Sequence, residues 1–178
     1  LLFLARTEQP DAQLNKQPLS LEREIAAVCA FHQAMADEQD VALMARGTGT
    51  VMADSDLLRR ALGNLIVNAL RHTPAGGQVI VEARETAERG VEIIVGDTGR
   101  GIAPEDLPHV FDRFYRADRA RPHQGSGTGL GLAIVQSVMQ LHGGIVSLDS
   151  EQEHGTTAIL VFPAPDTSSR CVLDSPSS

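Results

Sequence analysis

Apolar residues recur at helical spacing in three segments of the chain, and polar residues fill the positions between them. The segment 54–73 has the clearest pattern, since Asp54 or Ser55 caps its start and Pro74 ends it. Ser20 is the expected N-cap of the first segment. The pattern predicts amphipathic helices at about 21–39, 54–73 and 129–142.

Strand-forming residues dominate the stretches between these helices. We expect two short strands turned by Gly47 and Gly49, and then two hairpins, the second around Gly155. The predicted strands are 41–46, 50–53, 78–84, 90–97, 145–150 and 156–162. This order predicts an α/β two-layer sandwich, in which helices cover one face of a mixed, mostly antiparallel sheet. The order is not a strict βαβ alternation, which argues against a doubly wound fold.

The two ends of the chain differ from its middle. Residues 1–20 are expected to contain the end of an apolar helix, with the phrase LLFLAR, and then a polar linker, with a domain boundary after residue 17. Residues 18–163 form the expected domain, and 164–178, rich in Pro, Ser and Asp, form an expected disordered tail. Because the chain begins at Leu1 rather than Met, we expect it to be a fragment of a longer protein.

Charge and composition exclude several classes of function. The net charge of -8 argues against nucleic-acid binding. Lys16 is the single lysine, which excludes a glycine loop that grips phosphate through a lysine. Cys29 and Cys171 fit free thiols in a reducing compartment, with neither a disulfide framework nor a zinc site. We find no apolar run near the length of a membrane span.

Glycine alternates with other residues in GSGTGLGLAIV, residues 125–135, at the start of the third predicted helix. Backbone N–H groups at the positive end of a helix bind phosphate without a charged side chain, so this stretch is a candidate phosphate site. It matches neither GxGxxG nor the Walker A pattern. A flexible hinge before a helix is the alternative interpretation.

The motif DTGRGI, residues 97–102, follows a predicted buried strand. The carboxylate of Asp97 can accept a hydrogen bond from an exocyclic amine, and Gly99 and Gly101 let a flat base approach the backbone closely. An ordinary Asp-Gly turn is the alternative.

Asn64, Asn68 and Arg71 share the polar side of the helix 54–73. Amide oxygens suit Mg²⁺, and an arginine can hold a phosphate through two hydrogen bonds. A solvated helix face is the alternative, although Glu or Lys would favour the helix more than two asparagines do.

The segment FDRFYRADRAR, residues 111–121, places aromatic residues beside four arginines. One interpretation is a mobile lid whose arginines approach the phosphates. The other is a helix that docks its aromatic rings into the core.

Together these motifs resemble the catalytic ATP-binding domain of bacterial sensor histidine kinases, within the gyrase, chaperone and histidine-kinase ATPase superfamily. The resemblance covers about residues 18–163. NLIVNALRHTP is similar to the N box, DTGRGI to the first glycine box, FDRFYRA to the F box, GSGTGLGLAIV to the second glycine box and HGTTAILVFP to the final strand. The phrases ALRHTP and FDRFYRADRAR are most similar to sensors of heavy metals.

The resemblance implies a role for each matched position. Asp97 would contact the adenine amine, Asn68 would ligate Mg²⁺, and Asn64 stands where hydrolytic relatives have a glutamate base. Since an amide cannot accept a proton from water, Asn64 fits phosphoryl transfer to a protein better than ATP hydrolysis. The lid would span about 103–126. Asn64 and Arg71 would act in catalysis, and the other residues expected at the nucleotide are His72, Gly99, Gly101, Ile102, Arg116, Gly127, Thr128, Gly129, Leu130, Gly131 and Thr156 or Thr157.

The resemblance also implies partners. None of the six histidines is followed by an acidic residue, so the phosphoacceptor histidine is expected on a dimerisation domain upstream. The implied reaction transfers the γ-phosphoryl group of ATP to that histidine, with Mg²⁺ as cofactor and a response regulator as a further partner. We expect the fragment to be a monomer and the cytoplasmic part of a homodimeric inner-membrane protein. An ATPase of the same superfamily and a nucleotide-gated interaction module are the alternatives.

Overall fold

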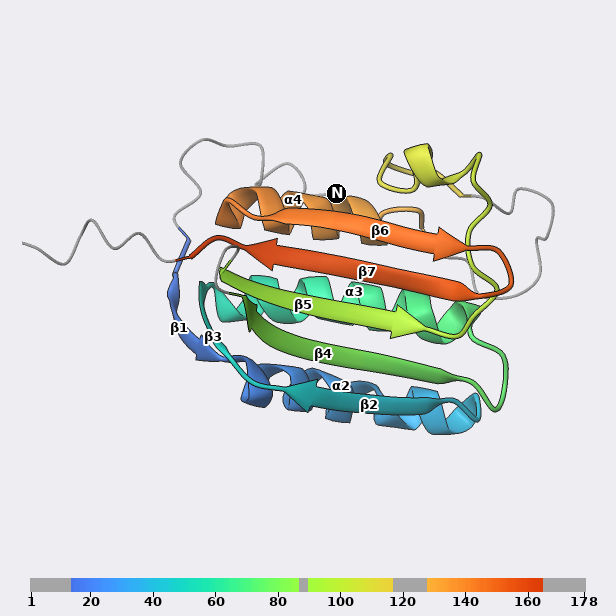
Figure 1. Cartoon of the computed structure of the whole chain (residues 1–178), viewed down its shortest axis with the longest axis horizontal. Coiled ribbons are helices and arrows are strands. Elements are labelled where there is room, and N and C mark those ends of the chain that lie inside the picture. Colours follow the sequence, from blue (N-terminus) through green and yellow to red (C-terminus); the bar gives the residue numbers. More distant parts are fainter. Residues whose placement is uncertain (1–13, 87–89, 117–127, 165–178) are drawn as a thin grey trace, which may run out of the picture.

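A five-stranded sheet forms one layer of the molecule, and helices form the other (Figure 1). The structure, a computed structural model, describes residues 14–86, 90–116 and 128–164. The strand order is β2-β4-β5-β7-β6, with β2 parallel to β4 and the other neighbours antiparallel. The strands are β2 (Ala42–Gly47), β4 (Gln78–Thr86), β5 (Gly90–Asp97), β6 (Ile145–Glu151) and β7 (Gly155–Phe162). The predicted sandwich with a mostly antiparallel sheet is confirmed.

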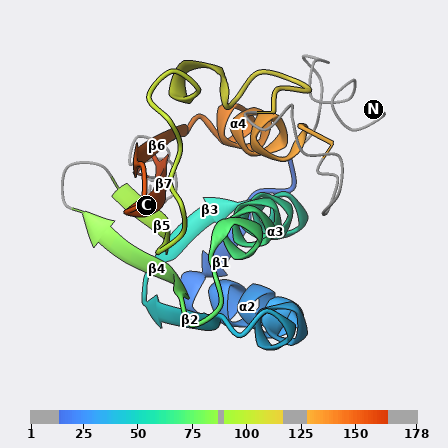
Figure 2. The ribbon, with the colours of Figure 1, turned by 90° about the vertical axis from the view of Figure 1, so that its right-hand side faces the viewer.

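Three helices cover one face of this sheet (Figure 2). They are α2 (Leu21–Glu38), α3 (Ser55–His72) and α4 (Gly131–His142). α2 packs against β2 and β4, α3 against β4 and β5, and α4 against β6 and β7. The predicted helices and the two predicted hairpins therefore form where the sequence pattern indicates.

The central helix α3 buries the apolar face that its sequence predicts. Asp54 caps the helix, because its Oδ1 accepts hydrogen bonds from the backbone N–H groups of Asp56 at 3.1 Å and Leu57 at 3.2 Å. The buried face includes Leu58, Leu62, Leu65, Ile66 and Ala69. Because α3 lies between α2 and α4, its position fixes both of its neighbours in the helical layer.

Alternation along the strands decides which side chains face the helices. In β5, Ile93 is buried under the helical layer, and Asp97 lies on the same face at the end of the strand. In β7, Leu160 is buried in the same way, and Thr156 shares its face. Thr157 therefore points to the open face of the sheet, so Thr156 is the threonine that lies beside Asp97.

In the first half of the chain, the two short strands predicted at 41–46 and 50–53 are present at Ala42–Gly47 and Thr50–Ala53, but one expectation is wrong. The segment predicted as a linker contains strand β1 (Gln17–Ser20), which pairs antiparallel with β3 (Thr50–Ala53) in a separate two-stranded sheet. Consequently β2 and β3 are not neighbours across the Gly47 turn. Each of them pairs with a distant segment instead, which local sequence does not specify.

The start of α2 also differs from the prediction. Ser20 occupies the N-cap position, but its side chain makes no capping hydrogen bond in the described structure. The backbone N–H of Leu21 donates to the Gly49 carbonyl at 2.9 Å instead. A turn from another part of the chain thus satisfies the first N–H group of the helix.

Several predictions fall outside the described residues. These are the apolar helix end at 1–13 and the tail at 165–178, which contains Cys171. Cys29 is a free thiol in the core, and burial raises its pKa to about 11. Across the described ranges, no helix is long and apolar enough to cross a membrane.

Candidate functional site

Four chain segments meet at one edge of the sandwich, on the right of Figure 1. β5 ends there at Asp97, β7 begins there at Gly155, α3 ends at His72 and α4 begins at Gly131. The described residues that the sequence singled out lie on these elements or on the loops beside them. The fold therefore gathers motifs that are far apart in the chain.

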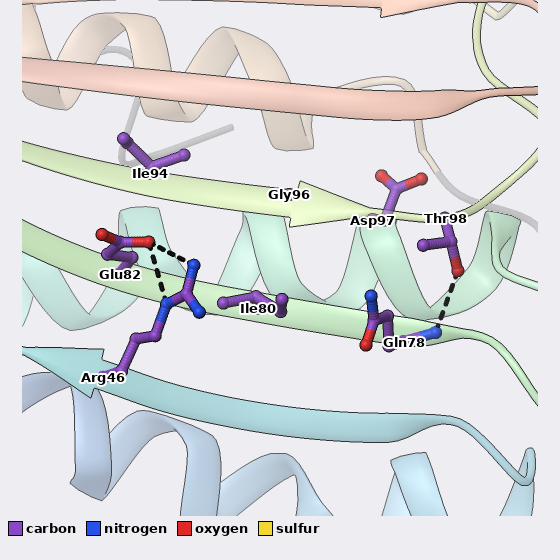
Figure 3. Close-up of a pocket in the computed structure, with 8 residues that line it drawn as sticks. All are labelled: Arg46, Gln78, Ile80, Glu82, Ile94, Gly96, Asp97 and Thr98. Atoms are coloured by element: carbon purple, nitrogen blue, oxygen red, sulfur yellow. Dashed lines mark hydrogen bonds and ion pairs between the residues drawn. The ribbon is translucent and has the colours of Figure 1, made fainter.

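Asp97 is the last residue of β5, and within the described structure its half-buried carboxylate is hydrogen-bonded through only one of its two oxygens. Its Oδ1 accepts hydrogen bonds from the backbone N–H groups of Gly99 at 2.8 Å and Thr156 at 3.2 Å. Oδ2 accepts none from any described residue, so it is available to a ligand. Burial raises the pKa of Asp97, and the two backbone hydrogen bonds oppose that shift. Figure 3 shows the carboxylate pointing toward β7.

The loop after Asp97 is anchored first on the end of α3. The N–H of Arg100 donates to the His72 carbonyl at 3.2 Å. A Cβ at Gly99 would lie 2.5 Å from that same carbonyl oxygen, so a larger residue would force the loop away from α3. These contacts hold the first glycine motif directly beside the last turn of the asparagine-bearing helix.

The same loop is then anchored on the hairpin of β6 and β7. Gly101 has a φ of 68°, and a Cβ there would lie 2.1 Å from the Glu151 carbonyl oxygen. Only glycine fits such a close approach at a positive φ. The N–H of Ile102 donates to Ser150 Oγ at 2.9 Å. The glycine motif is therefore held between α3 and the hairpin.

The polar face of α3 carries the predicted amides. The Nδ2 group of Asn64 donates to the Arg60 carbonyl at 2.8 Å, and a Cβ at Gly131 would lie 3.3 Å from Asn64 Oδ1. Asn64 thus faces the first residue of α4. The amide of Asn68 is half-buried and has no hydrogen-bond partner among the described residues, and the Arg71 side chain is exposed. Both are therefore accessible to a ligand.

The second glycine motif leads directly into α4. Leu130 is the N-cap residue of α4, and within the described chain no side chain caps the first turn. Thr128 is exposed, and Gly129 has a φ of 67°. The N–H groups of the first turn consequently remain available, as a helix that binds an anion requires.

Within FDRFYRADRAR, the described residues 111–116 form turns and irregular backbone and not the helix that one interpretation proposed. The short 3₁₀ helix η1 (Leu107–His109) lies just before them. Phe114 is 61% exposed, so it does not dock into the core. The Tyr115 hydroxyl donates to Asp106 Oδ1 at 2.5 Å, and Arg116 is exposed. The remainder of the predicted lid, with Gly127, lies outside the described residues.

The open face of the sheet has a shallow hollow of about 230 Å³ (Figure 3). Ile80 and Ile94 line it, and the Arg46–Glu82 ion pair, at 2.6 Å, closes one end. Asp97 is the one predicted site residue in its lining. The hollow lies on the side of the sheet away from α3, and it reaches the edge described above only at the end of β5, at Asp97 and Thr98.

Sequence reasoning missed Ser150. Its hydroxyl contacts Ile102, Gly155 and Thr156, and so joins the glycine motif to the final strand. A serine in a predicted hairpin strand gives no local signal for this position. The register of β6 on β7, which places Ser150 opposite Thr156, is what reveals it.

The sheet order, with helices on one face and an acidic strand end beside α3, defines the class of two-layer α/β sandwich domains. A family model described as histidine kinase-, DNA gyrase B- and HSP90-like ATPase matches residues 53–166, and the chain belongs to this family. The expected resemblance is confirmed.

Two curated relatives have names that agree with this assignment. The sensor protein IrlS of Burkholderia pseudomallei is 44% identical over 164 residues, which cover 92% of this chain and 35% of the relative. The sensor histidine kinase CusS of Escherichia coli is 41% identical over 165 residues, which cover 92% of this chain and 34% of the relative. The chain thus spans about a third of the length of these relatives.

Solved structures show the same fold. The mycobacterial sensor histidine kinase MprB matches with a TM-score of 0.70 and 30% identity, over 84% of this chain and 99% of that one. The full-length protein ShkA, in complex with AMPPNP, matches with a TM-score of 0.80 and 28% identity, over 92% of this chain and 35% of that one.

Proposed function

We propose that this chain is the ATP- and Mg²⁺-binding catalytic domain of a two-component sensor histidine kinase. The observation that carries the proposal is the pairing of two open groups at one edge of the fold. One is the unengaged Oδ2 of Asp97, and the other is the uncapped first turn of α4. An adenine amine fits the first group, and phosphate fits the second.

The base end of the proposed site uses groups that are already fixed. Gly99 and Thr156 hold Asp97 Oδ1, so Oδ2 needs no reorganisation to accept a hydrogen bond from a 6-amino group. Such preorganisation favours binding, because little conformational freedom is lost when the ligand arrives. The N–H of Ile102 donates to Ser150 Oγ, which in turn contacts Thr156 Oγ1, so the loop backbone is linked to the residue beside Asp97.

The phosphate end uses backbone N–H groups and arginine. The first turn of α4 supplies dipoles that favour negative charge, and the exposed Arg71 lies on the same side of α3 as Asn64 and Asn68. Arg116 would approach from the loop. This chain's part in phosphoryl transfer would be to orient the nucleotide and neutralise its charge.

The residues present fit Mg²⁺ held together with phosphates. Among the described residues no group of three or more His, Cys, Asp or Glu side chains is placed to hold a metal, whereas the Asn68 amide is unengaged. Mg²⁺ commonly takes one or two protein ligands and completes its shell with water and phosphate oxygens. When bound, ATP–Mg²⁺ supplies the γ-phosphoryl group and the charge neutralisation at that group.

Transfer rather than hydrolysis is favoured by Asn64. Its amide faces Gly131 at the start of α4, and it has no basic atom that could accept a proton from water. The proposed acceptor is a histidine on a dimerisation domain of the parent protein, which would be a membrane-anchored homodimer. A response regulator would then receive the phosphoryl group. The heavy-metal stimulus suggested by the sequence remains a prediction.

A calorimetric titration with a non-hydrolysable ATP analogue tests the nucleotide site. Wild type should bind, Asp97→Asn should lose binding, and Asn68→Ala should lose mainly the dependence on Mg²⁺. Asp149→Asn is the matched control, since the Asp149 side chain is exposed on the open face of the sheet, opposite to the face that carries Asp97 and Thr156. Absence of wild-type binding, both by heat and by a second probe, would contradict the proposal.

The transfer step needs its own test. A separately produced dimerisation domain carrying the phosphoacceptor histidine is mixed with this domain and ATP labelled on the γ-phosphate. Label should appear on the histidine and should depend on Asp97. Tight nucleotide binding without any transfer would favour the nucleotide-gated interaction module instead.

A further inference from the structure

Ser150 joins three segments of the site through one hydroxyl group. The N–H of Ile102 donates to Ser150 Oγ at 2.9 Å, and Oγ donates to the Gly155 carbonyl at 2.9 Å. The third contact is with Thr156 Oγ1, also at 2.9 Å, where either hydroxyl is a possible donor. The Ser150 side chain is half-buried near the end of β6.

Counting protons decides the direction of the third hydrogen bond. A serine hydroxyl has one proton to donate and two lone pairs that can accept. The Gly155 carbonyl can only accept, so the Ser150 proton belongs to that bond. Ile102 occupies one lone pair of Oγ, and Thr156 must therefore donate its own proton to the other.

Thr156 Oγ1 is left as a pure acceptor by this arrangement. Its single proton is engaged by Ser150, and its lone pairs remain. The backbone N–H of the same residue donates to Asp97 Oδ1, so Thr156 lies directly beside the carboxylate. The open positions here, Thr156 Oγ1 and Asp97 Oδ2, are both acceptors. A ligand must bring a hydrogen-bond donor to this point.

We propose that Ser150 is a specificity-determining positioning residue, which selects a 6-amino purine by fixing the Thr156 hydroxyl as an acceptor. This inference rests on the proposed nucleotide-binding function. Adenine has an exocyclic N–H₂ donor at position 6, whereas guanine has an acceptor oxygen there. Two fixed acceptors match the amine and repel the carbonyl oxygen. Without Ser150, the Thr156 hydroxyl can rotate and offer its proton to a carbonyl.

The test compares the affinities of non-hydrolysable ATP and GTP analogues for a set of variants. Ser150→Ala should reduce the ATP-over-GTP affinity ratio about tenfold. This is the effect expected when one hydrogen-bonding group changes from a fixed acceptor to a possible donor. Ser150→Thr keeps the hydroxyl and should have the same ATP-over-GTP affinity ratio as wild type. Ser147→Ala is the matched control on the same strand, because Ser147 is exposed on the open face.

A double variant shows whether Ser150 acts through Thr156. Thr156→Val should lower the ratio by itself, and adding Ser150→Ala to it should lower the ratio no further. Equal losses of ATP and GTP affinity in Ser150→Ala, with an unchanged ratio, would reduce Ser150 to a structural role and overturn the inference. If Ser150→Ala binds neither analogue, an unchanged ATP-over-GTP affinity ratio in Thr156→Val overturns the inference.

The outcome for wild type separates the two proposals. Failure of wild type to bind either analogue contradicts the nucleotide site itself, and the inference fails with it. Wild-type binding with no change of ratio in the variants contradicts only the role of Ser150. Thermal melting of each variant, compared with Ser147→Ala, shows that the chain is folded in every titration.

Discussion

The backbone N–H of Phe114 donates a hydrogen bond to the carbonyl of Gly129 at 2.9 Å, and both residues have left-handed backbone conformations. The φ angles are 66° at Phe114 and 67° at Gly129. For a bulky residue this conformation is unusual and costs free energy. The contact ties Phe114, which lies within the predicted lid at 103–126, to the residues that lead into α4 beside the proposed phosphate end.

Gly129→Ala should break this connection. A Cβ there would lie 2.7 Å from the Phe114 carbonyl carbon, in addition to the strain of a positive φ. The matched control is Gly143→Ala, where φ is 73° but no atom lies within 4 Å of the added Cβ. The control should lose about 1–2 kcal/mol of unfolding free energy from strain alone. Gly129→Ala should lose more and bind the ATP analogue more weakly.

Denaturant unfolding and calorimetry measure both effects. Equal destabilisation in the two glycine variants, with equal nucleotide affinity, would show that the Phe114 contact contributes nothing to the site.

The sequence predicted the helices and hairpins because their signals are local. Apolar spacing in 54–73 and the stop at Pro74 identify α3 without any tertiary information. The strand β1 gave no such signal, since four residues containing Pro18 form a strand only when β3 is available as a partner. The same holds for the start of α2, where the Leu21 N–H pairs with the distant Gly49 carbonyl, a contact that local sequence does not specify.

The residues of the candidate site fall into the same two groups: those with a local sequence signal and those that depend on contacts between distant segments. Asp97 and Asn68 were predicted from motifs, because each lies in a recognisable stretch of sequence. Choosing Thr156 over Thr157 required knowledge of which residues of β7 face the helices. Finding Ser150 required the register of β6 on β7. Such pairings depend on contacts between segments that composition and spacing do not link.

Asp97→Asn should remove nucleotide binding without destabilising the empty protein. Because burial raises the folded-state pKa of Asp97, its contribution to stability is largest below its ordinary pKa of 3.8 and is lost as pH rises through the folded pKa. At neutral pH the ionised form therefore carries a cost, which the neutral amide avoids. The amide oxygen can still accept from Gly99 and Thr156.

Thermal melting at neutral pH and calorimetry check this prediction together. The unfolding midpoint of Asp97→Asn should equal or exceed that of wild type, while affinity for the ATP analogue falls at least tenfold, as expected for a lost hydrogen bond to a charged group. A clearly lower midpoint would mean that the carboxylate has a structural role.

Two ion pairs that join neighbouring strands should differ in their contribution to stability. Arg84 pairs with Glu92 at 2.9 Å, and the Glu92 side chain is 9% exposed. Arg46 pairs with Glu82 at 2.6 Å, and the Glu82 side chain is 30% exposed. Arg84→Ala leaves a buried carboxylate without its partner and should cost about 1–3 kcal/mol. Arg46→Ala should cost about 0–1 kcal/mol.

Urea unfolding distinguishes these values. Adding Glu92→Gln to Arg84→Ala should recover part of the loss, because the buried charge is then removed. If the two arginine variants are equally stable, burial of Glu92 is not what makes its pair important.

His142 should make the stability of the domain depend on pH. The buried ring joins two helices, since its Nε2 accepts from the Asp54 N–H at 3.0 Å and its Nδ1 bonds to the Val138 carbonyl at 2.8 Å. Accepting from Asp54 requires Nε2 to be unprotonated, so the neutral ring is the form that fits. Burial lowers the pKa of His142 from its ordinary value of 6.5, and Lys16 acts in the same direction. The hydrogen bond to Val138 and the nearby Asp54 carboxylate oppose this shift.

The sign of the pH effect follows from the lowered pKa. The unfolded chain binds a proton at His142 more readily than the folded chain does, so stability is complete above pH 6.5 and decreases as pH falls toward the folded pKa. His142→Gln cannot be protonated and should reduce the loss of unfolding free energy between about pH 7.5 and pH 5. His154→Gln is the matched control, because the His154 side chain is 70% exposed. Urea unfolding across this pH range measures the slope, and a slope that is the same in His142→Gln and wild type would contradict the assignment of the neutral ring.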